Sequence, residues 1–134
     1  MRHTPTTALA IAAFFTFTTA FSLSAAAKEP LGPQTGEAAC YSRRLTGHRT
    51  TSGQRYNPNA LTAAHGTIPL GSHVKVTNLE NGKSVVVLVN DHMSSRGKII
   101  MDISGRACDE LHFGPGGEAR VKLEVEPSTA AASR

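Results

Sequence analysis

Two residues of the chain have side chains and surroundings suited to acid–base chemistry, Asp91 and His65. Asp91 follows the apolar run Val85–Val89, and a carboxyl at the rim of an apolar core loses part of its water shell. It is therefore a candidate general acid. His65 follows the apolar-leaning stretch 61–64 and could hydrogen-bond a carboxylate or a substrate hydroxyl. Each residue also has a structural alternative: Asp91 could cap a loop at 91–97, and His65 could be a histidine satisfied at the end of a strand.

A polar segment at residues 51–59 precedes His65 and could supply contacts to a ligand. It contains amide side chains, among them Gln54 and Asn57, and a tyrosine, Tyr56. Such side chains suit hydroxyl-rich ligands, although they also fill ordinary loops. The other histidines and the cysteines lack the spacing of metal ligands, so we expect neither a metal nor a cofactor.

A hairpin must position these two groups, because it occupies most of the stretch between them. Residues 73–77 alternate polar and apolar side chains, as in a half-buried strand. The pair Asn81-Gly82 is typical of a two-residue hairpin turn of type I′, in which both central residues have positive φ. The run 85–89 is apolar at every position, which predicts a strand buried on both faces.

The rest of the pattern predicts a mainly β protein. Short strands are expected at 99–101 and 121–125, and one short helix at 105–111 with Ser104 as its N-cap. Many short strands with turn signals and a single small helix favour a closed β-barrel over a parallel layered fold.

The first 27 residues have the features of a secretory signal peptide. Arg2 and His3 give a positive start, and the uncharged apolar run 8–23 is followed by small residues. The alternative, a membrane-spanning helix, needs about 20 apolar residues. No cysteine ends the apolar run, so we expect no lipid anchor. We predict a linker at 28–35, one folded domain at 36–126 and a disordered tail at 127–134.

The overall charge is mildly basic, with 14 Lys and Arg against 10 Asp and Glu. This fits an ordinary solvated surface, or a weak attraction to an anionic polymer such as a cell wall. Only three aromatic residues follow the signal segment, too few for platforms on which bases stack. We therefore expect no binding to nucleic acid.

The chain contains two cysteines, Cys40 and Cys108. In an exported protein an even number favours a disulfide. A bridge closing this loop would stabilise the fold by about 4 kcal/mol in the chain-entropy description. Two unrelated buried thiols are the alternative.

A series of sequence stretches in the folded part forms a recognisable combination. They are Gly-Glu-Ala-Ala-Cys-Tyr at 36–41, Thr-Thr-Ser-Gly-Gln-Arg-Tyr-Asn at 50–57, Leu-Thr-Ala-Ala-His at 61–65, Ile-Pro-Leu-Gly at 68–71, Val-Lys-Val-Thr-Asn-Leu at 74–79, Asn-Gly-Lys-Ser-Val-Val-Val at 81–87, Val-Asn-Asp at 89–91 and Met-Asp-Ile-Ser at 101–104. Over about residues 36–125 the chain resembles the rare lipoprotein A family. The resemblance implies a small six-stranded double-psi β-barrel.

The resemblance also implies a lytic transglycosylase. Such enzymes cleave the β-1,4 bond between N-acetylmuramic acid and N-acetylglucosamine in peptidoglycan and leave a 1,6-anhydro end. The sugar's own 6-hydroxyl is the nucleophile, so one acid–base residue can suffice, in contrast to two-carboxylate hydrolysis. Asp91 matches the family's catalytic aspartate and His65 its histidine. The expected substrate-binding residues are Gln54, Tyr56, Asn57, Asn90 and Asp102.

The chain departs from the family pattern around this site. Gln54 and Asn57 stand where glutamate and aspartate are frequent, and residues 92–94, His-Met-Ser, replace Arg-Gly-Pro after the aspartate. Cys40 replaces an aromatic residue, which together with Cys108 in the short helix favours the disulfide. These departures keep a second hypothesis open, a non-catalytic expansin-like barrel that binds or loosens wall polymers. A third is a barrel that serves mainly as a protein partner in the envelope.

The enzyme and binding-module hypotheses both predict the same main partner, the glycan strands of peptidoglycan. The signal peptide predicts export, with a periplasmic or secreted protein and no stable membrane anchor. The sequence does not identify any cell-division or envelope protein that the chain binds.

Overall fold

The computed structural model describes residues 31–127; the predicted signal peptide 1–27, the start of the linker and all but the first residue of the tail lie outside the described residues. The elements are β1 (Gln34–Cys40), η1 (Arg43–Leu45), β2 (Thr62–His65), β3 (His73–Asn78), β4 (Ser84–His92), β5 (Ile99–Ile103), α1 (Gly105–Leu111) and β6 (Glu118–Val125). β1 thus begins inside the segment predicted as a linker. Across 31–127, no helix is long and apolar enough to cross a membrane.

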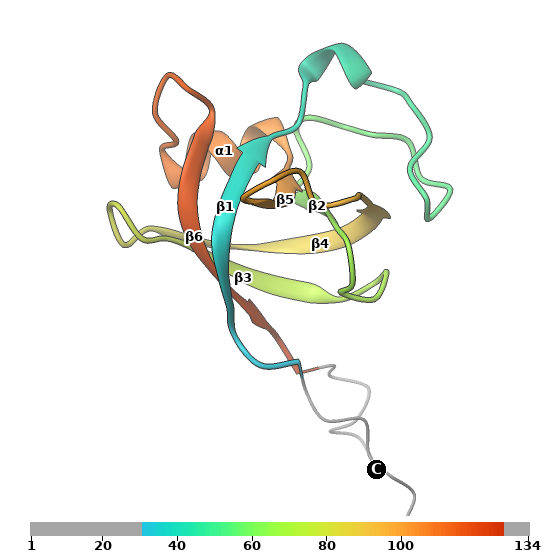
Figure 1. Cartoon of the computed structure of the whole chain (residues 1–134). Coiled ribbons are helices and arrows are strands. Elements are labelled where there is room, and N and C mark those ends of the chain that lie inside the picture. Colours follow the sequence, from blue (N-terminus) through green and yellow to red (C-terminus); the bar gives the residue numbers. More distant parts are fainter. Residues whose placement is uncertain (1–30, 128–134) are drawn as a thin grey trace, which may run out of the picture.

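The six strands close into a barrel in the order β1-β5-β2-β4-β3-β6 (Figure 1). Two neighbouring pairs are parallel, β1 with β5 and β2 with β4, and the remaining neighbours are antiparallel. The prediction of a mainly β, closed six-stranded barrel with one short helix is confirmed. Closure leaves no sheet edge exposed.

The core fills the inside of the barrel with aliphatic side chains from alternating strand positions. In β3, Val74 and Val76 are fully buried while His73 and Lys75 are exposed. Burying one aliphatic side chain contributes about 1.5–3 kcal/mol. The other large core residues, all less than 2% exposed, are Ile68, Val87, Val89, Met101, Ile103, Leu111, Val121 and Leu123. This core anchors the strands that carry the polar site.

The prediction that β4 is buried on both faces is wrong. Val87 and Val89 have no exposed surface, whereas Val86 on the opposite face is 41% exposed. In an all-apolar run the alternation of a strand is hidden, because an outward valine has the same sequence signal as an inward one. β4 also continues to His92, so Asp91 lies within the strand and not in a loop after it.

The hairpin between β3 and β4 is present, but its turn is longer than predicted. The N–H of Asn78 donates to the carbonyl of Lys83 at 2.8 Å, which leaves residues 79–82 in the loop. Of the predicted turn pair only Gly82 has a positive φ, 75°, whereas a type I′ turn needs it at both positions. The buried Asn78 accounts for the difference, because its side-chain N–H donates to the Leu111 carbonyl at 3.0 Å and ties the start of the loop to α1.

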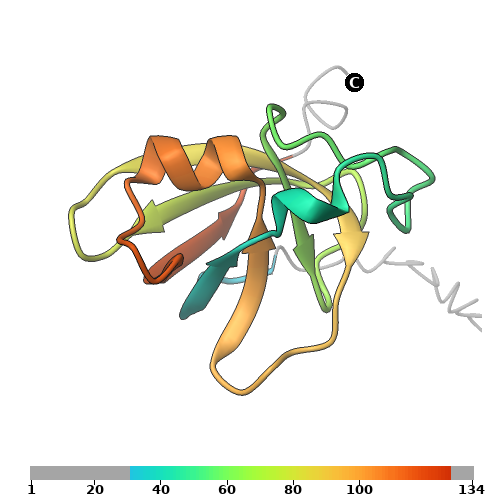
Figure 2. The same ribbon diagram turned by 90° about the horizontal axis from the view of Figure 1, so that it is seen from above.

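The helix α1 has the predicted bounds and N-cap. The Ser104 hydroxyl accepts a hydrogen bond from the N–H of Ala107. Cys108 on this helix forms a disulfide with Cys40 at the end of β1, with an S–S distance of 2.04 Å. The predicted disulfide is therefore present. α1 packs against β4 (Figure 2), and the disulfide links it to β1.

Candidate active site

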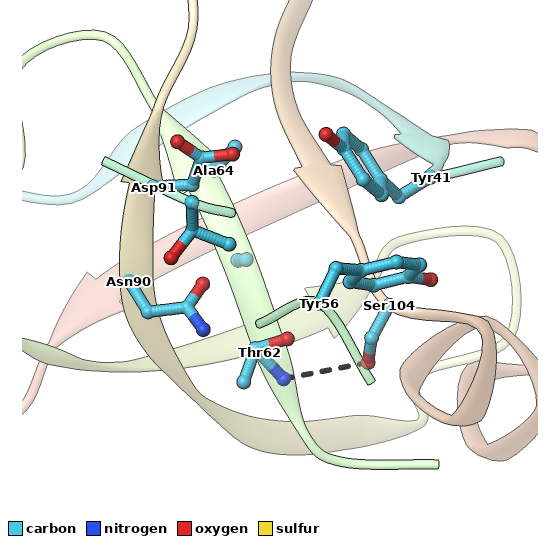
Figure 3. A pocket seen from close by; sticks show the side chains of 9 residues that line it. Tyr41, Tyr56, Thr62, Ala64, Asn90, Asp91 and Ser104 are labelled. Atoms are coloured by element: carbon cyan, nitrogen blue, oxygen red, sulfur yellow. Dashed lines mark hydrogen bonds between the residues drawn. The ribbon is translucent and has the colours of Figure 1, made fainter. Parts of the chain in front are cut away.

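A pocket opens at the end of the barrel where β2, β4 and the residues that follow β1 and β5 meet (Figure 3). In the close-up view, Asn90 and Asp91 of β4 lie on one side and Tyr41 and Tyr56 on the other. The long connection 41–61 projects from this end of the barrel (Figure 1). The complete lining is Tyr41, Thr50, Tyr56, Thr62, Ala63, Ala64, Asn90, Asp91 and Ser104.

The carboxylate of Asp91 is oriented through one of its two oxygens. Oδ1 accepts hydrogen bonds from the Thr51 N–H at 2.9 Å, the Thr51 hydroxyl at 2.6 Å and the His92 N–H at 2.9 Å. Oδ2 accepts none of the hydrogen bonds found within residues 31–127. The geometry therefore fixes the group on the pocket wall and leaves one oxygen to exchange a proton with a ligand.

Asn90 and Gln54 form an amide pair at the edge of the pocket. Asn90 is 6% exposed, and its Nδ2 donates to Gln54 Oε1 at 3.2 Å. Gln54 is exposed and closes the turn that begins at Thr50, whose N–H donates to the Gln54 carbonyl at 2.8 Å. This hydrogen bond holds Gln54, a predicted substrate-binding residue, beside the strand that carries Asp91. The remaining amide donors suit sugar hydroxyls.

Two tyrosines form the opposite wall. The rings of Tyr41 and Tyr56 pack edge to face with centroids 4.6 Å apart, and the Tyr56 hydroxyl accepts from the Gly105 N–H at 3.3 Å. Burial raises the pKa of both phenols, and for Tyr41 the carboxylates of Asp91 and Asp102 raise it further. Both hydroxyls are therefore neutral near physiological pH, and Tyr41 can donate to a ligand.

Asp102 is a second carboxylate near the site, with a different environment. It is 5% exposed, and both of its oxygens accept from Arg96 Nη2 at 2.9 Å. Burial raises the pKa of Asp102, the Arg96 guanidinium opposes that rise, and the Asp91 carboxylate adds to it. Asp102 is thus close enough to Asp91 to interact with it, but it lies outside the pocket lining and is occupied by an ion pair.

His65 does not share the pocket with Asp91. The ring is buried; its Nδ1 accepts from the N–H groups of Thr67 and Ile68 at 3.0 Å each, and its Nε2 lies 3.1 Å from Gln34 Oε1. Because Nδ1 accepts, the neutral ring carries its proton on Nε2 and donates it to Gln34. Burial lowers the pKa of His65, and His92 adds to that effect. The ring thus closes the turn after β2.

His65 can nevertheless influence Asp91 through the sheet. Ala64, the preceding residue, is the register partner of Asp91, and His65 that of His92. His92 donates from its Nδ1 to the His65 carbonyl at 3.2 Å. Both histidines therefore make structural hydrogen bonds. Within residues 31–127, no group of three or more His, Cys, Asp or Glu side chains is arranged to hold a metal ion.

The sequence did not identify some site residues, and Asn57, like His65 and Asp102, was predicted for the site but lies outside the pocket lining. The Oδ1 of Asn57 accepts from the Asn59 N–H at 2.9 Å within its own turn, and the residue is outside the pocket lining. Thr51, which orients Asp91, has no signal that distinguishes it from other loop threonines. For Arg96 the sequence contains a turn signal, the following Gly97. Gly97 has a φ of 60°, and the turn pairs Arg96 with Ile99 at the start of β5.

The fold and the pocket define the class of protein as a small β-barrel with one ligand-accessible carboxylate on its pocket wall. The family described as "Lytic transglycolase", whose domain is a double-psi β-barrel, matches residues 33–123. The chain belongs to this family, and the predicted resemblance is confirmed.

The names of curated relatives agree with the family assignment. The endolytic peptidoglycan transglycosylase RlpA of Neisseria meningitidis is 50% identical over 91 residues, which make up 68% of this chain and 38% of that protein. The probable endolytic peptidoglycan transglycosylase RlpA of Synechocystis is 44% identical over 90 residues, 67% of this chain and 28% of that protein. The chain thus spans well under half the length of these curated relatives.

Solved structures show the same fold at low sequence identity. The Streptomyces papain inhibitor superimposes with a TM-score of 0.57 at 20% identity, covering 74% of this chain and 98% of that one. The expansin of Clavibacter michiganensis superimposes with a TM-score of 0.58 at 18% identity, covering 72% of this chain and 52% of that one. At this level of identity the likeness supports the barrel architecture alone.

Proposed function

We propose that the chain is an endolytic lytic transglycosylase that cleaves the β-1,4 bond between N-acetylmuramic acid and N-acetylglucosamine in peptidoglycan. The observation that carries the proposal is the Asp91 carboxylate, with Oδ1 held by three hydrogen bonds and Oδ2 open to a ligand. Family membership and the named relatives support it. We further propose that the chain is exported and acts in the periplasm or outside the cell.

In the proposed reaction Asp91 first acts as an acid. Its proton passes to the glycosidic oxygen while the bond from C1 of N-acetylmuramic acid to that oxygen breaks. The C6 hydroxyl oxygen of the same sugar then bonds to C1, and its proton passes to the Asp91 carboxylate. The products are a chain end with a free 4-hydroxyl and a 1,6-anhydro end; no water is consumed, and Asp91 regains its proton.

The other residues have positioning or binding roles in this proposal. Gln54 and Asn90 would bind sugar hydroxyls beside Asp91, and Tyr41 and Tyr56 would provide an aromatic wall against a sugar ring. We assign His65 to positioning, because its ring fixes the end of β2 and does not reach the pocket lining. Asp102 would act only through its charge, while Asn57 shapes the loop.

The test is product formation from isolated sacculi by the protein purified after export. Mass spectrometry of the released fragments should show 1,6-anhydro ends for the wild type and none above background for Asp91→Asn. The matched control is Asp109→Asn, which removes an exposed carboxylate of α1 that is paired with Arg43 and lies outside the pocket lining, and which should leave the activity unchanged.

The outcome also decides between catalysis and simple binding. A wild-type protein that co-sediments with sacculi but releases no fragments would overturn the enzymatic proposal. The amide pair of Gln54 and Asn90, which can bind hydroxyls without acid–base chemistry, would then support the alternative, a non-catalytic expansin-like barrel that binds cell-wall glycan.

A further inference from the structure

The connection between β1 and β2, residues 41–61, concentrates positive charge that the pocket chemistry does not use. No Asp or Glu occurs between Glu37 and Glu80. The connection projects from the barrel (Figures 1 and 2), and Tyr41, Thr50 and Tyr56 within it line the pocket. Its cationic side chains are all exposed, and they are Arg43, Arg44, Arg49 and Arg55.

Arg49 and Arg55 lie directly opposite each other in an isolated antiparallel bridge. Side chains at such positions are neighbours with Cβ atoms about 5 Å apart, and like charges there destabilise the pair. Arg49 Nη1 donates to the Gly53 carbonyl at 3.2 Å, and Arg55 Nη1 donates to the Gly47 carbonyl at 2.9 Å. Both guanidiniums are therefore oriented by backbone carbonyls, Arg49 toward the tip of the turn and Arg55 toward its base.

The pair has no counter-ion within residues 31–127, where the ion pairs involve Arg43, Arg96, Arg106 and Lys122 only. Each guanidinium has five N–H donors, so most donors of both remain for a ligand. Arginine forks match the geometry of carboxylates, and charge-assisted bonds of this kind are stronger than neutral ones. Each of these oriented, unneutralised guanidiniums can therefore bind an external carboxylate.

The turn enclosed by the two arginines is the one that contacts the catalytic strand. Thr51 within this turn donates two hydrogen bonds to Asp91, and Gln54 accepts from Asn90. Thr50 and Tyr56, which line the pocket, directly follow Arg49 and Arg55 in the chain, so a polymer that extends beyond the pocket can reach the arginines.

We propose that Arg49 and Arg55 form a subsite for carboxylate groups of the glycan polymer, next to the pocket. The inference rests on the proposed function, because that substrate carries carboxylates at defined places. The lactyl group of N-acetylmuramic acid ends in a free carboxylate where no peptide is attached, and attached peptides carry carboxylates of their own. The two sources present the same chemistry to the arginines.

The experiment measures binding without turnover, in the Asp91→Asn background, by co-sedimentation with insoluble wall polymer at low salt. The test variant is Arg49→Gln/Arg55→Gln. The control of equal charge is Lys83→Gln/Arg120→Gln, which changes an exposed residue of the β3–β4 loop and an exposed residue of β6. Three polymers are compared: sacculi with peptides, glycan stripped of peptides, and sacculi whose carboxyls have been converted to amides. Thermal melting checks that each variant is folded.

The test variant should bind carboxylate-bearing polymer roughly five- to tenfold more weakly than the control, and the difference should shrink as salt increases. On amidated sacculi the two should bind alike. A defect confined to stripped glycan would identify the lactyl carboxylate, and one confined to sacculi the peptide carboxylates. Equal binding of the test variant and the control to both native sacculi and stripped glycan, or an equal difference on amidated sacculi, would overturn the proposal. Neither result depends on whether anhydro products form.

Discussion

Asp91 and Asp102 lie near each other at one end of the barrel, yet their surroundings differ in every respect that matters for proton transfer. Asp91 is half-buried on the pocket wall, and neutral donors bind only its Oδ1. Asp102 is 5% exposed, and both oxygens bind the Arg96 guanidinium. The first can exchange a proton with a ligand, whereas the second is engaged in an ion pair that joins β5 to the loop after β4.

The difference teaches that the role of a carboxylate is set by its partners. Neither residue type nor position separates the two, because each lies on a barrel strand with Ala64 of β2 as its register partner. What separates them is the hydrogen-bond partner. Asp91 binds Thr51 on a loop distant in sequence, and Asp102 binds Arg96, six positions earlier in the chain. The predictions below test this division.

The largest expected effect is on catalysis. Asp91→Asn should lower the rate of anhydro-product release by about 10³-fold, within the range for removal of a general acid–base group. Asp102→Asn should lower it by less than about tenfold, because asparagine can still accept from Arg96. The measurement is the initial rate on sacculi for both variants, each shown to be folded. Comparable losses in two folded variants would break the distinction between the carboxylates.

The next effect is on stability and concerns the partner of Asp102. Arg96→Gln should lower the free energy of unfolding by about 1–2 kcal/mol near pH 8, because a buried carboxylate loses its charged donor; the exposure of Arg96, 65%, keeps the loss below that of a fully buried pair. Urea denaturation measures it. Arg106→Gln, which breaks the exposed pair with Glu110, should cost less than about 0.5 kcal/mol.

The stability of Arg96→Gln should also depend on pH, which gives a second test of the ion pair with Asp102. Burial already raises the pKa of Asp102, and without Arg96 the opposing influence is lost, so the pKa rises further. A carboxyl with a higher pKa in the native state than in the unfolded state contributes stability at low pH, and this is lost as pH rises through the native pKa. The loss of unfolding free energy in Arg96→Gln should therefore become smaller as the pH falls through the native pKa of Asp102. A deficit independent of pH would contradict the assignment.

A smaller effect is expected from the partner of Asp91. Thr51→Val removes the hydroxyl donor to Oδ1 and keeps the backbone N–H, so the carboxylate becomes less well oriented. Activity should fall roughly tenfold, the equivalent of one hydrogen bond to a charged group, with little change in melting temperature. Thr51→Ser keeps the hydroxyl and should retain most of the activity. Equal rates for valine and serine would show that the hydroxyl bond has no role in positioning Asp91.

Much of the fold follows from local signals. The alternation at 73–77 predicts β3, and the Ser104 N-cap before an apolar helix face predicts α1, because both signals depend only on neighbouring residues. The outward face of β4 and the turn at 79–82 could not be predicted in the same way. Val86 has the same composition signal as a core valine, and the turn is set by a bond from Asn78 to α1, which is distant in sequence.

The site divides along the same line. Asp91, Asn90, Gln54 and Tyr56 were identified from residue type and family resemblance, and the structure places all four at or beside the pocket. Their partners could not be found from sequence, because the bond from Thr51 to Asp91 spans 40 residues. The convergence of His65 with Asp91 was expected, and instead the ring points to groups in its own turn and in β1.

The smallest effect concerns His65, which, like Asp102, has a structural role and does not transfer a proton to the ligand. Burial lowers the pKa of His65 from its ordinary value of 6.5, so the unfolded chain takes up a proton at a higher pH than the native one. Stability from this group is complete above about pH 6.5 and is lost as pH falls through the native pKa. The free energy of unfolding should therefore decline between about pH 7 and pH 5, and His65→Gln should show a shallower decline.

The exposed His73 on β3 provides the control, because His73→Gln should keep the wild-type slope. An undiminished slope in His65→Gln would show that the ring is not held neutral in the native state. Activity near pH 7.5 gives the second readout. A folded His65→Gln protein should keep a measurable rate, since its ring only positions β2 beside Asp91. A loss of activity as large as that of Asp91→Asn would show that His65 takes part in the reaction. The residues involved in proton transfer would then include one on β2.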